Sequence, residues 1–543
     1  MEDRLTINNS IKTLFKRIAS LPAGSTLLSS LYLQTARLLL RVGHKTLALQ
    51  SISMAVQAAD ACKWKPSNFN ISVDRLLLQA TETHKRMHQE PSNLPDTAVS
   101  TSMDTAYMLG LPIEVLCMVL KQLLVLDLVR ASHVCKRWRR VLMDNPTLWS
   151  KLDCSFLASS RSKLRISNQM LEWLARRSRQ TLQLLIVPEC SRLTATSLAP
   201  FRSYRLAGLS TIVLTNNSKI SGSTLVDLAR SAPNLASLTL DTMRQLDSLS
   251  LRILLIRCIH LKELYITNCT AVTSSAFTHL EKMQCSLVKL GLAGCSISDS
   301  VIEYLAGFWC QSLIAIDLSR CRLLTRHTLL HLALFKRLES VKIDSLNLSL
   351  PKNLSIQDSF LIFAEGCSSL STLSMRDCPE LTSQCILYIL QLCDSLSTLH
   401  IPGSAQINDQ VLLFMIMDGV CDRIVDLNIS QCPRLTSSAL LPFASKLGHI
   451  KRFIASSCPG ITDNIVQAVL SASKALEYLD ISLCPNVRGS GLHEGIQAYL
   501  NNHPSSKSSG LMLNVSSNPQ IRVETITYLK NVLGEANVAS HIG

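Results

Sequence analysis

Aromatic residues are scarce in this 543-residue chain, at 5%, whereas hydrophobic residues make up 47%. The core must therefore consist mainly of aliphatic side chains. No apolar run reaches the eighteen or so residues that a membrane-spanning helix needs, because Pro112, Glu114, Lys121 and Asp127 interrupt the most hydrophobic window, 109–129. The first thirty residues also lack the basic start and apolar core of a secretory signal. We expect a nuclear or cytoplasmic protein, neither secreted nor in a membrane.

Catalytic and metal-binding motifs are missing as well. The sequence has no phosphate-binding loop and no nucleophile elbow, and its 13 histidines form no spaced set. No Cys-x-x-Cys pair or Cys/His pairing at zinc spacing occurs. We therefore expect no enzymatic activity, no metal and no other cofactor. The 19 cysteines, in a chain expected inside the cell, indicate reduced thiols.

Positive charge is what the chain has in excess, with a net charge of +15. Residues 121–180 hold thirteen Lys and Arg residues against four acidic ones. Such a region can steer an acidic partner or contact nucleic-acid phosphates, and a merely solvated surface remains equally open. Few aromatic residues lie among these basic ones, which argues against a platform for stacking single-stranded nucleic acid and makes nucleic acid an unexpected direct ligand.

From residue 182 the sequence repeats about every 26 residues, as in SLIAIDLSRCRLLTRHTLLHLA. The first half of each unit alternates like a strand and the second half has helical spacing. One unit cannot bury its own apolar face, so the units must stack into a curved solenoid lined by a parallel sheet. The pattern resembles the cysteine-containing leucine-rich repeat. Thirteen units start at Leu182, Leu209, Leu235, Leu261, Leu287, Leu313, Leu338, Leu370, Leu396, Ile424, Ile450, Leu476 and Gly510.

One position of each unit is usually cysteine. Because cysteine is small, buries readily and donates a weak hydrogen bond, we interpret the row as structural packing rather than as metal ligands. The row comprises Cys190, Cys269, Cys295, Cys321, Cys378, Cys432, Cys458 and Cys484, with Asn217 and Asn518 in the same register.

The variable residues beside the inner strand positions should face the concave side of the solenoid. There both signs of charge mix with amides and tyrosines, whereas a nucleic-acid groove would be mostly basic, so we expect a protein partner. The densest such mixture falls in three consecutive units, next to a Ser-rich insert at 501–509 that is placed to close over a bound segment. The predicted substrate-binding residues are Asp426, Asn428, Arg452, Tyr478 and Asp480.

Residues 111–149 carry a different pattern, LPIEVLCMVLKQLLVLDLVRASHVCKRWRRVLMDNPTLW. Pro112 suits a first helical position, and apolar residues then recur at helical spacing. The pattern indicates three short helices, too few to cover all of their own apolar surface, so part of it stays available to a partner. Trp138 and Trp149 are expected in internal packing. A three-helix linker with an ordinary core is the alternative.

The LP-E start, the VCKRW run and the DNPTLW end resemble the F-box, which docks onto the Skp1 adaptor of cullin-based ubiquitin ligases. The proline usual before the second helix is absent, and Leu124 and Val125 stand there. The resemblance implies Skp1 binding, and the acidic character of such adaptors would also explain the basic charge. Periodicity does not separate core residues from contact residues. The predicted adaptor-binding residues are Leu111, Pro112, Glu114, Leu116, Val119, Leu120, Leu123, Leu126 and Leu128.

Residues 1–88 have helical periodicity, and part of them resembles one tetratricopeptide repeat (TPR); a plain helical bundle is the alternative. Polar residues 89–109, with two prolines, indicate a linker. This order resembles the fungal tetratricopeptide–F-box–leucine-rich-repeat class, which is associated with chromatin, DNA replication and genome integrity. We expect an all-α F-box at 110–155, a connection at 156–181, an α/β repeat solenoid at 182–534 and a tail at 535–543.

The resemblance implies the substrate-recognition subunit of a Skp1–cullin–F-box (SCF) ubiquitin ligase. The F-box would bind Skp1 and, through it, a cullin–RING core. The concave repeat face would hold a protein substrate for ubiquitination and proteasomal degradation, and catalysis would come from proximity rather than from side chains of this chain. The alternative is a non-catalytic scaffold bound to Skp1, or a chromatin- or replication-associated adaptor without a cullin.

Overall fold

The structure is a computed structural model with two compact units, Met1–Cys154 and Ser155–Gly543. The predicted TPR-like region 1–88 and the linker 89–109 lie outside the described residues. Among the helices of the described part, none combines the length and apolarity that a bilayer crossing requires. The described residues are 113–155, 166–190, 192–279, 285–349, 355–502 and 510–540.

The described part of the first unit consists of short helices. Cys135 caps one of them, since its Sγ accepts a hydrogen bond from the backbone N–H of Trp138 at 3.4 Å. Trp149 is fully buried, and its indole Nε1 donates to the carbonyl of Leu142 at 2.8 Å. The elements are α5 (Ile113–Leu120), α6 (Val125–Ala131), α7 (Lys136–Asp144), the 3₁₀ helix η2 (Pro146–Trp149) and strand β1 (Lys151–Asp153).

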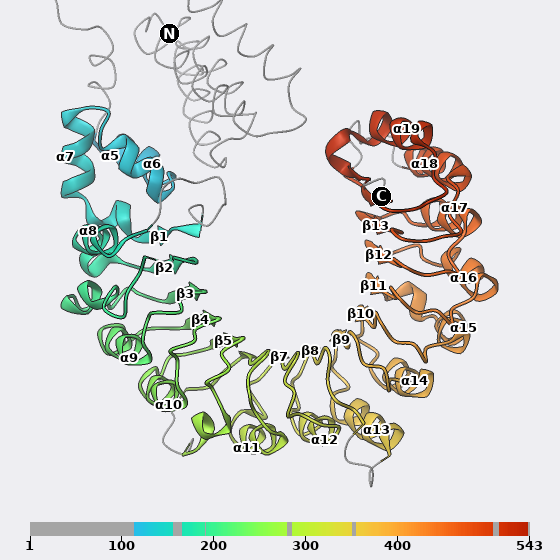
Figure 1. Cartoon of the computed structure of the whole chain (residues 1–543), viewed down its shortest axis with the longest axis horizontal. Coiled ribbons are helices and arrows are strands. Elements are labelled where there is room, and N and C mark those ends of the chain that lie inside the picture. The colour runs from blue at the N-terminus through green and yellow to red at the C-terminus, as the bar shows by residue number, and fades with distance from the viewer. Residues whose placement is uncertain are drawn as a thin grey trace, which may run out of the picture. The chain divides into compact units, whose positions relative to one another are not determined.

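The second unit is an arc with strands along its inner side and helices along its outer side (Figure 1). The strands are β2 (Leu184–Val187), β3 (Thr211–Thr215), β4 (Ser237–Asp241), β5 (Glu263–Thr267), β6 (Lys289–Gly291), β7 (Ala315–Asp317), β8 (Ser340–Lys342), β9 (Thr372–Ser374), β10 (Thr398–His400), β11 (Asp426–Asn428), β12 (Arg452–Ile454), β13 (Tyr478–Asp480), β14 (Met512–Asn514) and β15 (Val538–Ala539).

Helices or 3₁₀ turns connect these strands on the outer side. The α-helices are α8 (Asn168–Ser178), α9 (Gly222–Ser231), α10 (Ser248–Arg257), α11 (Asp299–Trp309), α12 (His327–Leu332), α13 (Ile356–Gly366), α14 (Ser383–Leu392), α15 (Asp409–Met417), α16 (Ser437–Ala444), α17 (Asp463–Ala472), α18 (Ser490–Asn502) and α19 (Val523–Leu533). The 3₁₀ helices are η4 (Arg179–Thr181), η5 (Ala199–Ser203), η6 (Ser274–Phe277), η8 (Val420–Asp422) and η9 (Glu535–Asn537).

The strands from β2 to β15 follow in sequence order, and each pairs in parallel with the next. Each of β2 to β14 begins two residues after one of the predicted starting points, and the central residue of each three-residue strand is buried. The predicted parallel solenoid is therefore confirmed. It also extends further than expected, because the predicted tail contains β15, where Val538 pairs with Leu513.

The cysteine row forms hydrogen bonds between units. Cys321 Sγ donates to the carbonyl of Leu292 in the preceding unit at 3.0 Å. Asn217 and Asn518 replace the thiol with an amide that donates at 2.9 Å to Val187 and Ile481. Cys269, Cys295, Cys378, Cys432, Cys458 and Cys484 donate in the same way at 3.2–3.7 Å to Leu240, Ile266, Ile343, Ile401, Ile429 and Ala455.

The residue just before this row has a left-handed backbone in unit after unit. Glycine tolerates that conformation without steric cost, and asparagine and aspartate tolerate it better than other residues do. Leu483 is the large apolar member of the row, at φ 57°. The row is Asn216, Thr242, Asn268, Gly294, Arg320, Ser345, Asp377, Gly403, Gln431, Ser457, Leu483 and Ser517.

The buried thiols make the solenoid sensitive to alkali. Burial raises the pKa of Cys321 to about 11 and that of Cys432 to about 12, from an ordinary value of 9.0. Below pH 9 both the folded and the unfolded chain keep these protons, so the contribution of the buried thiols to the free energy of unfolding is fully present. Above pH 9 the unfolded chain loses its thiol protons first, so that contribution decreases. We expect the free energy of unfolding in urea to be level up to about pH 8 and to fall from about pH 9 upward.

Cys321→Ser is the matched control, because a hydroxyl keeps a donor but does not ionise in this range. Its unfolding free energy should fall less between pH 8 and pH 10 than that of the unmodified chain. Equal slopes would contradict a contribution from the buried thiols.

Candidate functional site

The predicted adaptor-binding residues divide into two groups in the structure. Leu116 and Leu120 have no exposed surface and Leu128 has 2%, so they form the core of the first unit. Glu114 is exposed, and Val119, Leu123 and Leu126 are partly exposed, so these four can reach a partner. Leu111 and Pro112 lie outside the described residues. The buried leucines cannot contact a partner directly, and they can affect docking only by stabilising the helices that carry the exposed residues.

Four apolar residues that the sequence analysis did not select are well exposed in the same unit. Ile113 and Met118 on α5 are 52% and 59% exposed, and Leu124 and Val134 beside α6 are 48% and 60% exposed. Four large apolar side chains exposed within 22 residues are typical of an interaction surface. Leu124 also occupies the place of the missing proline, where it is the N-cap residue of α6. We call Ile113, Met118, Leu124 and Val134 the apolar docking set.

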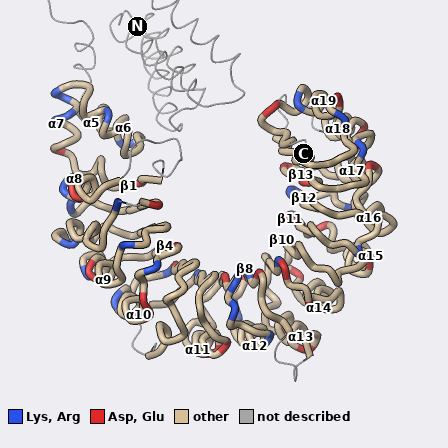
Figure 2. The backbone as a smooth tube through the Cα atoms, in the orientation of Figure 1, with Lys and Arg blue, Asp and Glu red and all other residues tan. Residues whose placement is uncertain are grey.

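The predicted substrate-binding residues come together on the concave side of the second unit. Asp426 is opposite Arg452, and Arg452 is opposite Tyr478, at the first position of three adjacent strands. Asn428 and Asp480 occupy the third position of β11 and β13. The parallel register therefore places residues about 26 positions apart side by side. This region of the inner face carries both charge signs (Figure 2).

Polar contacts join these residues into one chain across the strands. Asp426 Oδ1 lies 3.0 Å from His400 Nε2, and its Oδ2 lies 3.5 Å from Arg452 Nε. The Arg452 guanidinium carbon lies 5.3 Å from the centre of the Tyr478 ring, a cation–π contact. Tyr478 then donates from its hydroxyl to Asp480 Oδ2 at 3.3 Å. We call His400, Asp426, Arg452, Tyr478 and Asp480 the concave network.

The most accessible charged group of the concave network is the guanidinium of Arg452. The Arg452 side chain is 52% exposed, whereas that of Asp426 is 19% exposed. Asp480 is already supplied with donors, since it accepts from Asn514 Nδ2 at 2.9 Å and from Ser482 Oγ at 2.6 Å. Partial burial, reinforced by Asp480, raises the pKa of Tyr478, so its hydroxyl remains protonated at neutral pH. The site therefore presents a guanidinium held over an aromatic ring.

Asn428 contributes to the backbone more than to the surface. It is 5% exposed, and its Oδ1 accepts a hydrogen bond from the backbone N–H of Ser430 at 3.0 Å. It therefore shapes the end of β11 beneath the network. The insert at 501–509, expected to close over the site, lies outside the described residues apart from the end of α18.

Two apolar residues near the network were missed from the sequence. Met512 is opposite Tyr478 on β14 and is 51% exposed, and its place at the first strand position was the available signal. Leu483, three residues beyond Asp480, is 55% exposed in the left-handed conformation. Exposure and backbone strain both disfavour leucine there, and strained residues often occur at functional sites. Both side chains can add apolar contact to the charged network.

We expect Leu483→Asn to stabilise the fold while weakening binding of a partner at the concave network. Asparagine tolerates left-handed φ better, so the free energy of unfolding in urea should rise by on the order of 1 kcal/mol. Ser457→Asn, at φ 56° in the same row, should gain a similar stability, but it should leave partner binding unchanged because it removes no apolar side chain. A loss of stability in Leu483→Asn would show that the leucine is a structural residue.

Within the described ranges no three His, Cys, Asp or Glu side chains gather closely enough to hold a metal ion. The concave network itself presents a guanidinium, an aromatic ring and hydrogen-bonding groups.

Comparison with known proteins bears on the first unit. Residues 108–155 match the F-box-like family model, whereas no curated protein matches the chain. The chain is similar to the crystal structure of the Rad7–Elc1 complex of yeast, at 17% identity and a TM-score of 0.41, over 72% of this chain and 96% of that one. It is also similar to a leucine-rich-repeat protein from Bacteroides eggerthii, at 14% identity and a TM-score of 0.26, over 67% and 60% of the two chains. Residues 108–155 therefore match an F-box-like domain, and the second unit is a solenoid of parallel strand–helix repeats.

Proposed function

We propose that this protein is a non-catalytic substrate receptor of a Skp1–cullin–F-box ubiquitin ligase. Its F-box-like domain binds a Skp1-type adaptor, and the concave network binds a protein substrate for ubiquitination. The observation that carries the proposal is the F-box-like match at residues 108–155, in which the apolar docking set is exposed. An acidic adaptor would also be attracted by the exposed Lys136, Arg139 and Arg140 of α7.

The concave network supports the second half of the proposal. Arginine and tyrosine are enriched among the residues that dominate binding energy, and here Arg452 and Tyr478 hold each other in place. A partner that docks on them meets side chains that are already oriented, which lowers the entropy cost of binding.

A scaffold that binds an adaptor without a cullin is the second candidate, because the F-box-like domain supports adaptor binding equally in both cases. Copurification with a cullin distinguishes the two. We also propose, from the resemblance of the domain order to the fungal class, that the protein is located in the nucleus, in the cytoplasm or in both. Fluorescence microscopy of the tagged full chain tests the location.

We expect Met118→Glu combined with Val134→Glu to lower affinity for a purified Skp1-type adaptor at least tenfold. Both side chains are exposed, so the charges interrupt apolar contact without opening a cavity. Isothermal titration calorimetry measures the affinity, and the melting temperature should be unchanged. Gln122→Glu adds charge at an exposed polar position of the same unit and should bind normally.

Leu120→Ala tests the role of the buried leucines separately from that of the exposed docking residues, because it leaves a cavity in the core of the first unit. We expect it to lower the unit's stability by about 2–5 kcal/mol. Normal adaptor affinity in the Met118→Glu, Val134→Glu double variant would contradict the docking assignment.

Arg452→Glu combined with Tyr478→Ala should slow substrate turnover and leave adaptor binding intact. The substitution removes both the accessible cation and the ring that orients it. The readout is the half-life of proteins that accumulate when residues 110–155 are deleted. Arg434→Glu, an exposed arginine outside the network, is the control. Normal turnover in the double variant would place substrate recognition elsewhere.

A further inference from the structure

A groove on the outer side of the solenoid is lined by residues that have no role in the proposed function. It lies between the second halves of α9 and α10 and has a volume of about 610 Å³. Four of its lining residues are apolar and the other two are arginines. The lining residues are Ala229, Arg230, Pro233, Ile253, Ile256 and Arg257.

Helix α10 is apolar on both of its faces. Leu251, Leu254 and Leu255 are buried against the solenoid, as expected for a repeat helix. Leu249, Ile253 and Ile256 recur at i, i+4 and i+7, so they form a second apolar stripe, with Leu249 53% exposed. A surface helix normally turns a polar face to solvent. The packing of α10 within the solenoid therefore does not require the second stripe.

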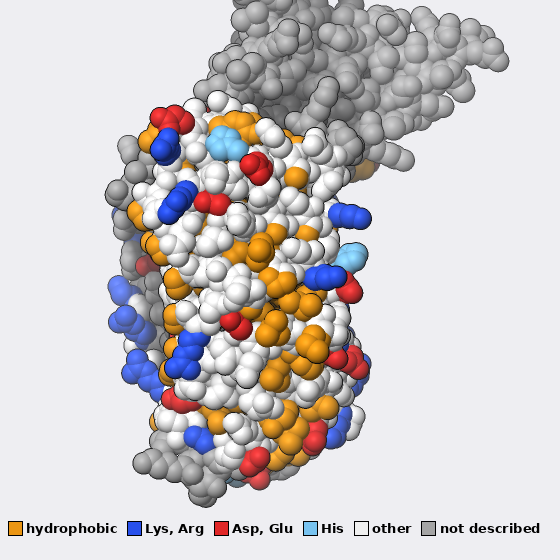
Figure 3. Space-filling model, turned by 90° about the vertical axis from the view of Figure 1, so that its right-hand side faces the viewer, with side chains coloured by type: hydrophobic (Ala, Val, Ile, Leu, Met, Phe, Trp, Pro, Cys, Tyr) orange, Lys and Arg blue, Asp and Glu red, His pale blue; other side chains and the backbone are white. Residues whose placement is uncertain are grey.

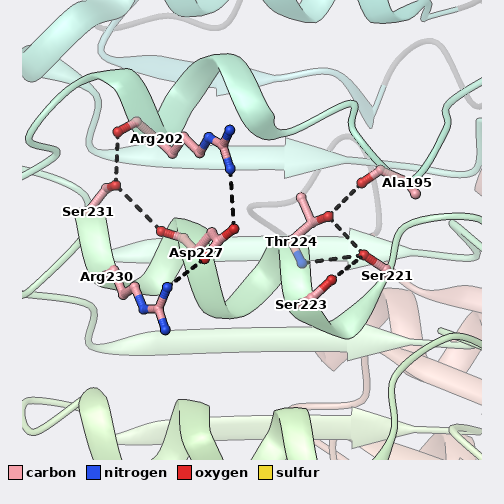
Figure 4. Close-up of polar contacts among 8 residues, drawn as sticks. All are labelled: Ala195, Arg202, Ser221, Ser223, Thr224, Asp227, Arg230 and Ser231. Atoms are coloured by element: carbon pink, nitrogen blue, oxygen red, sulfur yellow. Dashed lines mark hydrogen bonds and ion pairs between the residues drawn. The ribbon is translucent and has the colours of Figure 1, made fainter.

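Two arginines line the groove, and a third lies one repeat earlier. Arg230 and Arg257 lie in the last turns of α9 and α10, and Arg202 lies in the last turn of η5. Asp227 is shared between two of them, at 3.3 Å from Arg202 and 2.9 Å from Arg230 (Figure 4). Arg257 is exposed and has no ion pair among the residues that the structure describes. Two guanidinium groups thus share one carboxylate, and Arg257 adds a further positive charge to the lining of the groove.

The arginines in the last turns also complement the helix dipoles of α9 and α10. That role accounts for one cation at each helix end, but it does not account for an apolar stripe between them. A nucleic acid would use the cations and leave the apolar lining residues unmatched. A protein helix with aliphatic residues on one face and acidic residues beside them would match both. Leu413, Met417 and Leu441 on α15 and α16 are exposed as well. Figure 3 shows that hydrophobic side chains also gather on another face of the molecule.

We propose that this groove binds an amphipathic, acidic helix of a partner protein. The aliphatic face of that helix packs on Ile253 and Ile256, and its carboxylates pair with Arg230 and Arg257. Packing a helix into the groove between two helices is a common mode of peptide recognition. Because the groove is on the outer side of the solenoid, its occupant can bind at the same time as a molecule in the concave network.

The probe is a 16-residue synthetic helix with leucines at i, i+4 and i+7 and glutamates between them, added to the full chain. A scrambled peptide of the same composition tests the need for an amphipathic face. Fluorescence anisotropy should give micromolar binding of the amphipathic peptide and at least tenfold weaker binding of the scrambled one. Methyl NMR signals of Ile253 and Ile256 should shift with the amphipathic peptide.

Two variants test the charges. Arg230→Glu with Arg257→Glu should weaken binding about tenfold, whereas Arg322→Glu with Arg337→Glu changes the net charge equally at exposed positions away from the groove and should not. Asp227→Asn removes the competing carboxylate and should tighten binding severalfold. No peptide binding, equal effects of the two double variants, or a 20-nucleotide single-stranded DNA that displaces the peptide from the groove would overturn the proposal.

Discussion

Most units of the solenoid supply a side-chain donor for a buried carbonyl of the preceding unit. The Cys321 thiol reaches back to Leu292, and Asn217 and Asn518 make the same bond with an amide. A strand in a parallel sheet likewise has no partner within its own unit. Stability is therefore shared between nearest neighbours, and a local defect is transmitted to the adjoining units rather than across the whole array. This coupling keeps the inner strands in register.

The register in turn creates the concave network from residues that are distant in sequence. His400, Asp426, Arg452 and Tyr478 come from four consecutive strands and meet because each strand aligns with the next. Their ion pairs are partly exposed, so they contribute little to stability. Their main physical effect is to orient Arg452 and Tyr478. The sheet therefore acts as a rigid support that fixes the positions of these variable side chains.

The repeat period was sufficient to predict the spacing of the strands and the alignment of their variable positions between adjacent units. It was sufficient because side chains alternate along a strand and the same register recurs in each unit. The period did not predict which leucines of α5 and α6 are buried, since these helices are apolar over much of their surface and burial depends on neighbouring elements. Leu483 was missed for a related reason, because its backbone conformation comes from the turn and not from its own propensity. The strand β15 was missed because two residues are too few to show a periodic pattern in the sequence.

The shortness of β15 has a consequence for solubility. The last strand of a parallel sheet presents unpaired backbone groups that can recruit a strand from another molecule, and long exposed edges promote aggregation. Here β15 comprises Val538 and Ala539, and it is the last strand in the order of the sheet. Two residues offer too few hydrogen bonds to template a stable intermolecular strand, so this edge of the described sheet is a poor site for strand addition.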